Sequence, residues 1–182
     1  MHIFSSNYAD FKKEFTILSD DPQVATINNF LTDDECNHFI EISRNNLQKA
    51  LVCYAKEGGR SSGRTGQNCW IKHNHDKVTQ AVGQRIAQTI GLPLCNAEQY
   101  QVIHYDKTQE YRRHYDGWLH DKSQKSIRSM KNGGQRLVTA LCYLNDVPKG
   151  GSTQMTKLNI DVSPEKGKLL IFHNVQKNSN IR

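Results

Sequence analysis

Residues 111–118 read Tyr-Arg-Arg-His-Tyr-Asp-Gly-Trp, and this stretch carries the most informative pair of side chains in the chain. It reads as a β-strand over 111–116, in which side chains at positions i and i+2 point the same way. His114 and Asp116 are therefore expected on one face. An imidazole and a carboxylate aimed into one cavity form two thirds of the 2-His-1-carboxylate triad, which holds non-haem Fe(II) and leaves positions open for substrate and oxygen. A His-x-Asp pair alone can also be a structural pair on the surface. The rest of the sequence is needed to distinguish that pair from a metal-binding one.

The composition indicates an ordinary globular domain. The chain has 182 residues, of which 36% are hydrophobic and 23% charged, which excludes a disordered chain, and we expect residues 1–182 to form a single domain. No apolar run is long enough to span a bilayer, and residues 1–15 lack the apolar segment of a secretory signal, so we expect a cytoplasmic location. The net charge of +6 weakly favours an acidic or nucleic-acid partner, and a solvated basic surface explains it equally well.

The cysteines do not form a recognisable metal or redox motif. They are odd in number and scattered, and none has the C-x-x-C spacing, so reduced and mostly buried thiols are expected. The five positions are Cys36, Cys53, Cys69, Cys95 and Cys142.

The first half of the chain predicts two helices. Residues 22–31 read as a short strand, after which Thr32 and Glu35 have the spacing of a capping box at a helix that continues to about Lys49. A second helix is expected over 75–90, where apolar residues recur on one face and Gly91 supplies a stop.

The second half predicts strands. They are expected over residues 97–105, 111–116, 135–144, 153–158, 160–163 and 168–173, and loops over 57–68, 107–110 and 119–134. Residues 137–144 are apolar almost throughout, which is typical of a central strand buried on both faces. Helices followed by many short strands indicate an α+β fold, with a β-sandwich or barrel packed against N-terminal helices.

Several segments together resemble the prolyl 4-hydroxylases, a family of Fe(II)- and 2-oxoglutarate-dependent dioxygenases. Residues 101–116 resemble the first metal-binding segment of that family. The other matching segments are residues 30–36, 60–65, 133–147, 150–153 and 163–175. They occur in the family's order over residues 24–175, and this collinearity is more specific than any single motif.

The resemblance implies a fold and a set of site residues. The fold would be a double-stranded β-helix (jelly roll) packed against N-terminal helices, with iron held by His114 and Asp116 at one mouth. The cofactors would be Fe(II), 2-oxoglutarate, O₂ and ascorbate. Donor groups must compensate the buried far carboxylate of 2-oxoglutarate. The resemblance gives this role to Tyr105, Tyr143 and Thr153, and places Trp118 and Arg64 at the substrate.

The sequence departs from the family at its C-terminal end. The family's third ligand is a histidine beyond the Phe-x-Asn strand, followed by a lysine or arginine for 2-oxoglutarate, and the chain ends a few residues past Asn174. We therefore expect the C-terminal part of the domain to be missing from residues 1–182, leaving weak iron binding and poor turnover. His173 is the less favoured alternative for the third ligand.

The expected function is hydroxylation of peptidyl proline in a proline-containing peptide or protein, without a membrane partner. An oxygenase of the same superfamily acting on lysine, an amino acid or a nucleic-acid base is an alternative. Nucleic acid is the weaker substrate, because the sequence shows no aromatic clamp for a flipped base. A catalytically dead jelly-roll module that binds peptides is the third interpretation.

Overall fold

The structure is a computed structural model that describes residues 15–49, 63–118 and 124–175. In chain order its elements are β1 (Phe15–Asp20), β2 (Gln23–Ile27), α1 (Asp33–Arg44), β3 (Gln48–Lys49), β4 (Gln67–Ile71), α2 (Lys77–Ile90), a 3₁₀ turn (Leu94–Asn96), β5 (Tyr100–His104), α3 (Gln124–Gly133), β6 (Val138–Cys142), β7 (Thr153–Met155), β8 (Ile160–Val162) and β9 (Leu169–His173). None of the helices in these ranges could cross a membrane.

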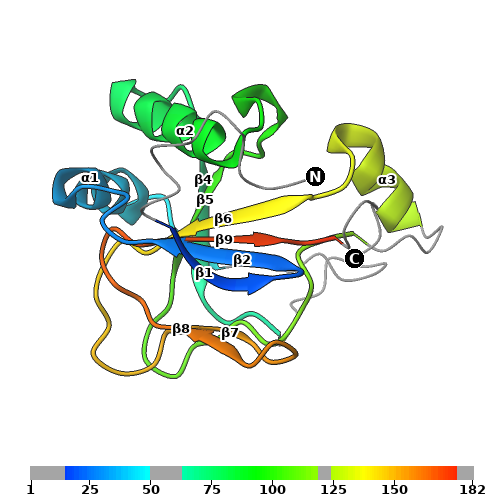
Figure 1. The fold of residues 1–182 in the computed structure, drawn as a ribbon. Helices are drawn as coiled ribbons and strands as arrows, with labels where there is room; N and C mark the ends of the chain where they lie inside the picture. Colours follow the sequence, from blue (N-terminus) through cyan, green and yellow to red (C-terminus); the bar gives the residue numbers. More distant parts are fainter. Residues whose placement is uncertain (1–14, 50–62, 119–123, 176–182) are drawn as a thin grey trace.

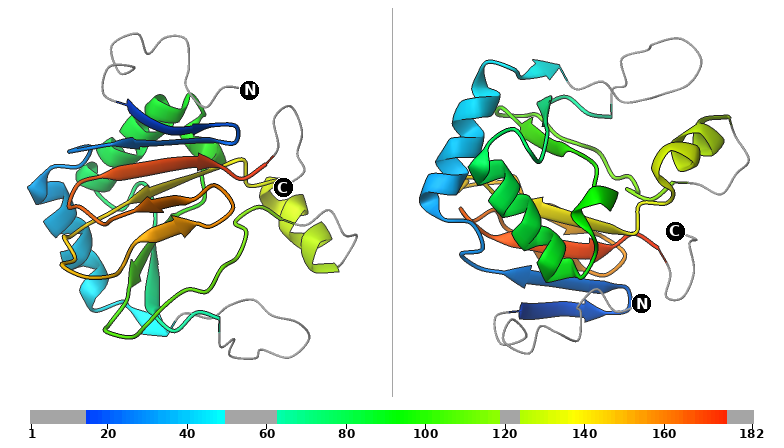
Figure 2. Two further views of the ribbon diagram at one scale, coloured as in Figure 1. Left: turned by 60° about the horizontal axis from the view of Figure 1, so that its bottom comes forward. Right: turned by 90° about the horizontal axis from the view of Figure 1, so that it is seen from above.

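The strands form one large sheet and two small ones. The large sheet has the order β1-β2-β9-β6, and the small ones are β3-β4-β5 and the hairpin β7-β8. Helices α1 and α2 lie over one face of the large sheet, and the hairpin lies beneath the other (Figures 1 and 2). The predicted α+β class is consistent with this arrangement.

Strand β9 separates two hydrophobic cores. Leu169 and Ile171 pack on the side of the helices and of β4 and β5, whereas Leu170 packs toward the hairpin. All three residues are fully buried. Alternation along this one strand therefore assigns each face of the large sheet to a different core.

Both predicted helices form: α1 has the expected start, and α2 begins at Lys77, two residues after the expected position, with Asp76 as its N-cap. Thr32 and Glu35 make the capping box of α1, through the Thr32 hydroxyl and the Glu35 carboxylate. The helix ends at Arg44 rather than near Lys49, because the Asn46 side chain donates to the Ile42 carbonyl and so competes with continued helix. Helix α2 ends as expected at Gly91, which adopts the left-handed conformation (φ 68°).

The central position predicted for residues 137–144 is wrong for the described strands. Among residues 15–49, 63–118 and 124–175, β6 pairs with β9 alone and is an edge strand. All five of its residues are only partly buried, although their apolar character is typical of a central strand.

The strand predicted over 111–116 is also wrong. Within the part of the chain that the structure describes, Tyr111 alone is paired there, in an isolated bridge with Arg64, and no described strand continues the ladder. The predicted loops 57–68 and 119–134 are wrong in part, since β4 begins at Gln67 and α3 occupies Gln124–Gly133. Strand β1 was not predicted, and residues 57–62 and 119–123 of those loops lie outside the described ranges.

The described cysteines agree with the expectation of free thiols. Cys36 and Cys69 are buried, Cys142 is intermediate and Cys95 is exposed, and all four are free. Cys53 lies outside the described residues.

Candidate metal centre

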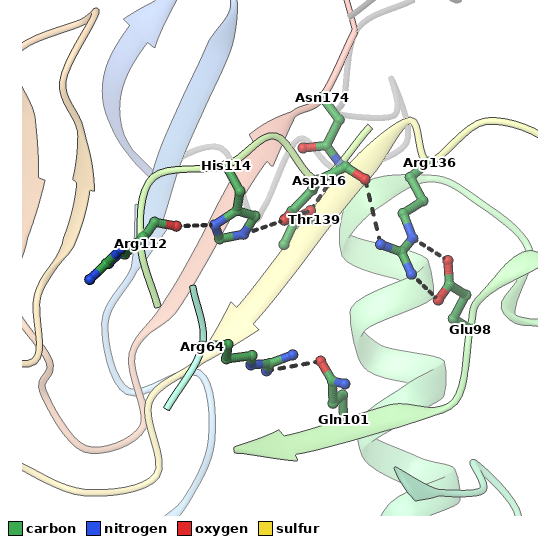
Figure 3. A network of polar contacts seen from close by, with 9 residues as sticks. All are labelled: Arg64, Glu98, Gln101, Arg112, His114, Asp116, Arg136, Thr139 and Asn174. Carbon is green, nitrogen blue, oxygen red and sulfur yellow. Dashed lines mark hydrogen bonds and ion pairs between the residues drawn. The ribbon is translucent and has the colours of Figure 1, made fainter. Parts of the chain in front are cut away.

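His114 and Asp116 meet despite the missing strand. His114 Nε2 lies 3.1 Å from Asp116 Oδ1 (Figure 3). The irregular segment that carries them is held by backbone hydrogen bonds to its neighbour, from Arg112 N to the Gly63 carbonyl (2.8 Å) and from Thr65 N to the Glu110 carbonyl (3.0 Å). These bonds replace the ladder that a strand would have supplied.

A hydrogen bond at Nδ1, the ring nitrogen that does not face Asp116, orients the His114 ring. Its Nδ1 lies 2.8 Å from the Arg112 carbonyl, which can only accept, so Nδ1 carries the hydrogen. Nε2 then faces a carboxylate oxygen, and two acceptors at this distance need a proton or a cation between them. Two ligand atoms at about 2.1 Å from one ion and at right angles lie about 3.0 Å apart, so this pair fits a metal ion.

A second hydrogen-bond chain fixes the carboxylate. Thr139 on β6 donates its hydroxyl to Asp116 Oδ2 at 2.6 Å and accepts from Asn174 Nδ2 at 2.8 Å. Figure 3 shows Thr139 and Asn174 grouped with Asp116 next to the His114 ring. Metal ligands commonly have such supporting partners, which orient them and tune the metal.

The electrostatics of the pair follow from burial and these bonds. Burial raises the pKa of Asp116, but the hydrogen bonds from His114 and Thr139 outweigh it and leave the pKa lowered. Partial burial lowers the pKa of His114, but its bonds to Asp116 and to the Arg112 carbonyl leave the pKa raised. A proton on Nε2 would be shared with the carboxylate, and a metal ion that binds between the two atoms would replace it.

The described residues do not complete a triad. No group of three His, Cys, Asp or Glu side chains suited to a metal occurs within them. On β9, His173 lies opposite Val138 of β6 and is on the same face of the large sheet as Ile171. Thr139 and Asp116 lie on the other face of that sheet. His120 falls in the part of the chain that the structure does not describe.

Trp118 is anchored two residues beyond the ligand. Gln135 accepts from Trp118 N at 2.7 Å and donates to the Trp118 carbonyl at 2.9 Å. The Arg136 guanidinium lies 4.2 Å from the indole centroid and forms an ion pair with Glu98. These contacts keep Trp118 half-buried beside the metal pair.

Two of the three residues expected at 2-oxoglutarate lie together. The Tyr143 hydroxyl is 2.7 Å from Thr153 Oγ1 and 3.2 Å from the Val162 carbonyl, at the junction of β6 and the hairpin. Tyr105, in contrast, follows β5 of the β3-β4-β5 sheet and is 39% exposed. Its ring packs so closely on Gly66 that a Cβ at that position would lie 2.6 Å from it.

Arg64 is buried rather than presented to solvent. It is 9% exposed, its Nη2 donates to Gln101 Oε1 at 3.2 Å, and its Cζ lies 4.8 Å from the Tyr111 ring centroid. The Tyr111 ring in turn stacks on His114, with centroids 3.5 Å apart and planes at 21°.

Sequence reasoning missed the residues that support the ligands: Thr139, Asn174, Gln135 and Arg136. They do carry a signal, because all four are polar residues within segments that match the family, and Thr139 stands inside an apolar run.

Comparisons with known proteins bear on this arrangement. The model of the 2OG-Fe(II) oxygenase superfamily matches residues 100–179. Prolyl 4-hydroxylase 5 of Arabidopsis thaliana is 31% identical over 186 residues, covering 91% of this chain and 62% of the relative. Probable prolyl 4-hydroxylase 7 of the same plant is 31% identical over 199 residues, covering 98% and 61%. The chain thus spans about three fifths of these relatives' length.

Solved structures show the same fold. A viral collagen prolyl hydroxylase from Paramecium bursaria Chlorella virus-1, in its 2-oxoglutarate complex, superimposes with a TM-score of 0.62 at 22% identity, over 84% of this chain and 78% of that one. A Pseudomonas putida prolyl 4-hydroxylase gives 0.55 at 21% identity, over 83% and 80%. The family-model match and the curated relatives thus support a 2OG-Fe(II) oxygenase of the prolyl 4-hydroxylase type.

Proposed function

We propose that this chain carries the metal-binding part of a prolyl 4-hydroxylase-like dioxygenase, with His114 and Asp116 as two iron ligands. The observation that carries the proposal is the 3.1 Å approach of Nε2 to Oδ1, with the opposite ring nitrogen bonded to a carbonyl. The relatives are named prolyl 4-hydroxylases, which favours peptidyl proline in a peptide or protein as the substrate.

The cofactors would be Fe(II), 2-oxoglutarate and O₂, with ascorbate keeping the iron reduced. When bound, they supply the oxidation: O₂ hydroxylates a C–H bond of the substrate while 2-oxoglutarate becomes succinate and CO₂. Asp116 offers a charged oxygen and His114 a neutral nitrogen once its Nε2 proton has left. The Thr139 hydroxyl keeps Asp116 Oδ2 occupied, so that Oδ1 faces the ion.

We further propose that the strands belong to a double-stranded β-helix (jelly roll) and that the third ligand comes from outside the described residues. Among the described residues, one edge of β6 is unpaired, and its mostly apolar residues are partly buried. Such an edge is suited to a further strand, which supports this proposal.

The far carboxylate of 2-oxoglutarate would be held by the hydroxyl groups of Tyr143 and Thr153, with Tyr105 as a further donor. Tyr143 and Thr153 already lie within hydrogen-bond distance of each other in a buried region, where a carboxylate needs donors. Trp118 would line the substrate groove, since its half-buried ring is fixed beside the ligand pair.

The test is succinate formation by the complete protein, supplied with Fe(II), 2-oxoglutarate and ascorbate. Proline peptides, lysine peptides and alkylated oligonucleotides would be compared as substrates. We expect turnover with proline peptides that is lost in Asp116→Ala and kept in Asp106→Ala, which removes an exposed carboxylate from a nearby loop. Turnover with oligonucleotides alone would favour another branch of the superfamily. Peptide binding that needs neither metal nor Asp116, without succinate, would favour the non-enzymatic module.

A further inference from the structure

Arg64 is a buried cation that the proposed function does not use. Within residues 15–49, 63–118 and 124–175 its guanidinium forms no ion pair, and its buried Nε has no hydrogen-bond partner. Its one hydrogen bond is to the neutral Gln101 amide. Burying a charge without a counterion is costly, so what this side chain contacts should explain its position.

The guanidinium is the outer member of a stack that ends on the metal pair. Arg64 lies over the Tyr111 ring, and Tyr111 lies nearly parallel to the His114 imidazole at 3.5 Å. The backbone sets this order, because Arg64 and Tyr111 face each other in an isolated bridge and Arg112 N donates to the Gly63 carbonyl. Figure 3 shows Arg64 beneath the segment that carries His114.

We infer that Arg64 is a positioning residue for the metal pair: its guanidinium holds the Tyr111 ring, and that ring holds the plane of the His114 imidazole. The inference rests on the metal site proposed above. The contacts of the two ring nitrogens, Nδ1 with the Arg112 carbonyl and Nε2 with Asp116, leave the ring plane free to tilt about the line that joins them. Within the described residues no sheet ladder stiffens the segment. Stacking on one face removes this freedom and keeps Nε2 directed at the ion.

The direction in which metal affinity changes when Arg64 is replaced distinguishes a positioning role from a purely electrostatic one. Arg64 is a positive charge near a site for a divalent cation, so its Coulomb effect opposes metal binding. If charge were its whole effect, Arg64→Gln would tighten metal binding and Arg64→Lys would leave it unchanged. Positioning predicts weaker binding in both variants, because neither glutamine nor a flexible ammonium reproduces the planar stack.

The experiment is an anaerobic titration of the 182-residue protein with Co(II), followed by visible absorption. We expect Arg64→Gln and Arg64→Lys to raise the dissociation constant by about tenfold or more, as supporting partners of metal ligands do. The matched control is Arg113→Gln, which removes an exposed positive charge next to His114 and should bind Co(II) as wild type does or more tightly. Tyr111→Phe keeps the ring and should stay near wild type, whereas Tyr111→Leu should match Arg64→Gln.

A metal-free readout keeps this inference distinct from the proposed function. The ring protons of His114 should show the NMR shift caused by the stacked Tyr111 ring, and Arg64→Gln should remove it while Arg113→Gln keeps it. If wild type binds no Co(II), loss of the shift would support the positioning role while the metal site fails. An unchanged shift in Arg64→Gln, or Co(II) affinity equal to or above wild type in Arg64→Gln or Arg64→Lys, overturns the inference. If circular dichroism shows that Arg64→Gln is unfolded, Tyr111→Leu tests the same stack.

Discussion

At the scale of single residues, one chain of hydrogen bonds determines what the site can do. It runs from Asn174 through Thr139 and Asp116 to His114, and ends at the Arg112 carbonyl. Each donor in this chain has an acceptor. Between Asp116 Oδ1 and His114 Nε2, a metal ion can take the place of a shared proton. The chain thereby converts two ordinary side chains into a directed pair of ligand atoms.

Replacing Thr139 with valine tests this chain. The change keeps the shape of the side chain but leaves Asp116 Oδ2 and the Asn174 amide without their shared partner. We expect metal affinity to fall about tenfold, the lower end of the effect seen for supporting partners. Calorimetric metal titration would measure it, with Thr139→Ser, which keeps the hydroxyl, as the control. Equal affinity in Thr139→Val and wild type would show that Asp116 needs no such support.

The sequence could place His114 and Asp116 together because the two are local neighbours. It could not pair either one with Thr139 or Asn174, because those contacts depend on the register of β6 against β9, in which Thr139 faces Phe172. Arg64 was assigned to the substrate from the family resemblance alone. The structure shows that the Arg64 side chain is buried and that its guanidinium lies over the Tyr111 ring, and neither fact can be read from the sequence.

At the scale of elements, the sequence predicted helix ends better than strands, because helix ends depend on local residues and strands depend on long-range pairing. The start of α1 and the end of α2 were predictable, because caps depend on residues within one turn. The segment 111–116 was predicted as a strand, but within the described residues only Tyr111 is paired. Strand β6 has the composition of a central strand, yet it lies at an edge of the described sheet. Strand identity depends on neighbours that periodicity does not contain.

The start of α2 gives a prediction with a defined pH dependence. The backbone hydrogen bond from Thr79, followed by contacts with His38, lowers the pKa of the Asp76 carboxyl despite some desolvation. A carboxyl with a lowered pKa in the folded state stabilises that state above its unfolded pKa, and this contribution is lost as pH falls through the folded pKa.

We therefore expect Asp76→Ala to lower the free energy of unfolding by about 1 kcal/mol at pH 7. The gap to wild type should narrow as Asp76 becomes protonated. Urea unfolding at a series of pH values measures this, with Asp106→Ala as an exposed carboxylate control. A gap that stays constant down to pH 3 would mean that the charge of Asp76 contributes nothing to its capping.

At the scale of the whole molecule, β9 links the two cores and the metal site. Its residues alternate between the helical side and the hairpin side, and it pairs with β6, which carries Thr139. The α+β class was predictable from the order of elements. The division into two cores was not, because it depends on which strands flank β9.

Leu170→Ala measures how far the hairpin-side core supports the whole fold. The side chain is fully buried with Val24, Tyr143 and Val162 around it, and its loss should cost about 2–5 kcal/mol of unfolding free energy. Ile17→Ala, at a 47% exposed position on β1, should change it by less than about 0.5 kcal/mol. Denaturant unfolding followed by circular dichroism compares the two. Similar values for both variants would show that this core contributes little.

The central claim is that His114 and Asp116 bind iron together with 2-oxoglutarate. The most direct measurement is an anaerobic titration with Fe(II) and 2-oxoglutarate, followed by the visible charge-transfer band of the chelate. We expect a band in the wild-type protein that disappears in His114→Ala and in Asp116→Ala. A band of equal strength in these variants, or none in the wild type at saturating iron, would contradict it.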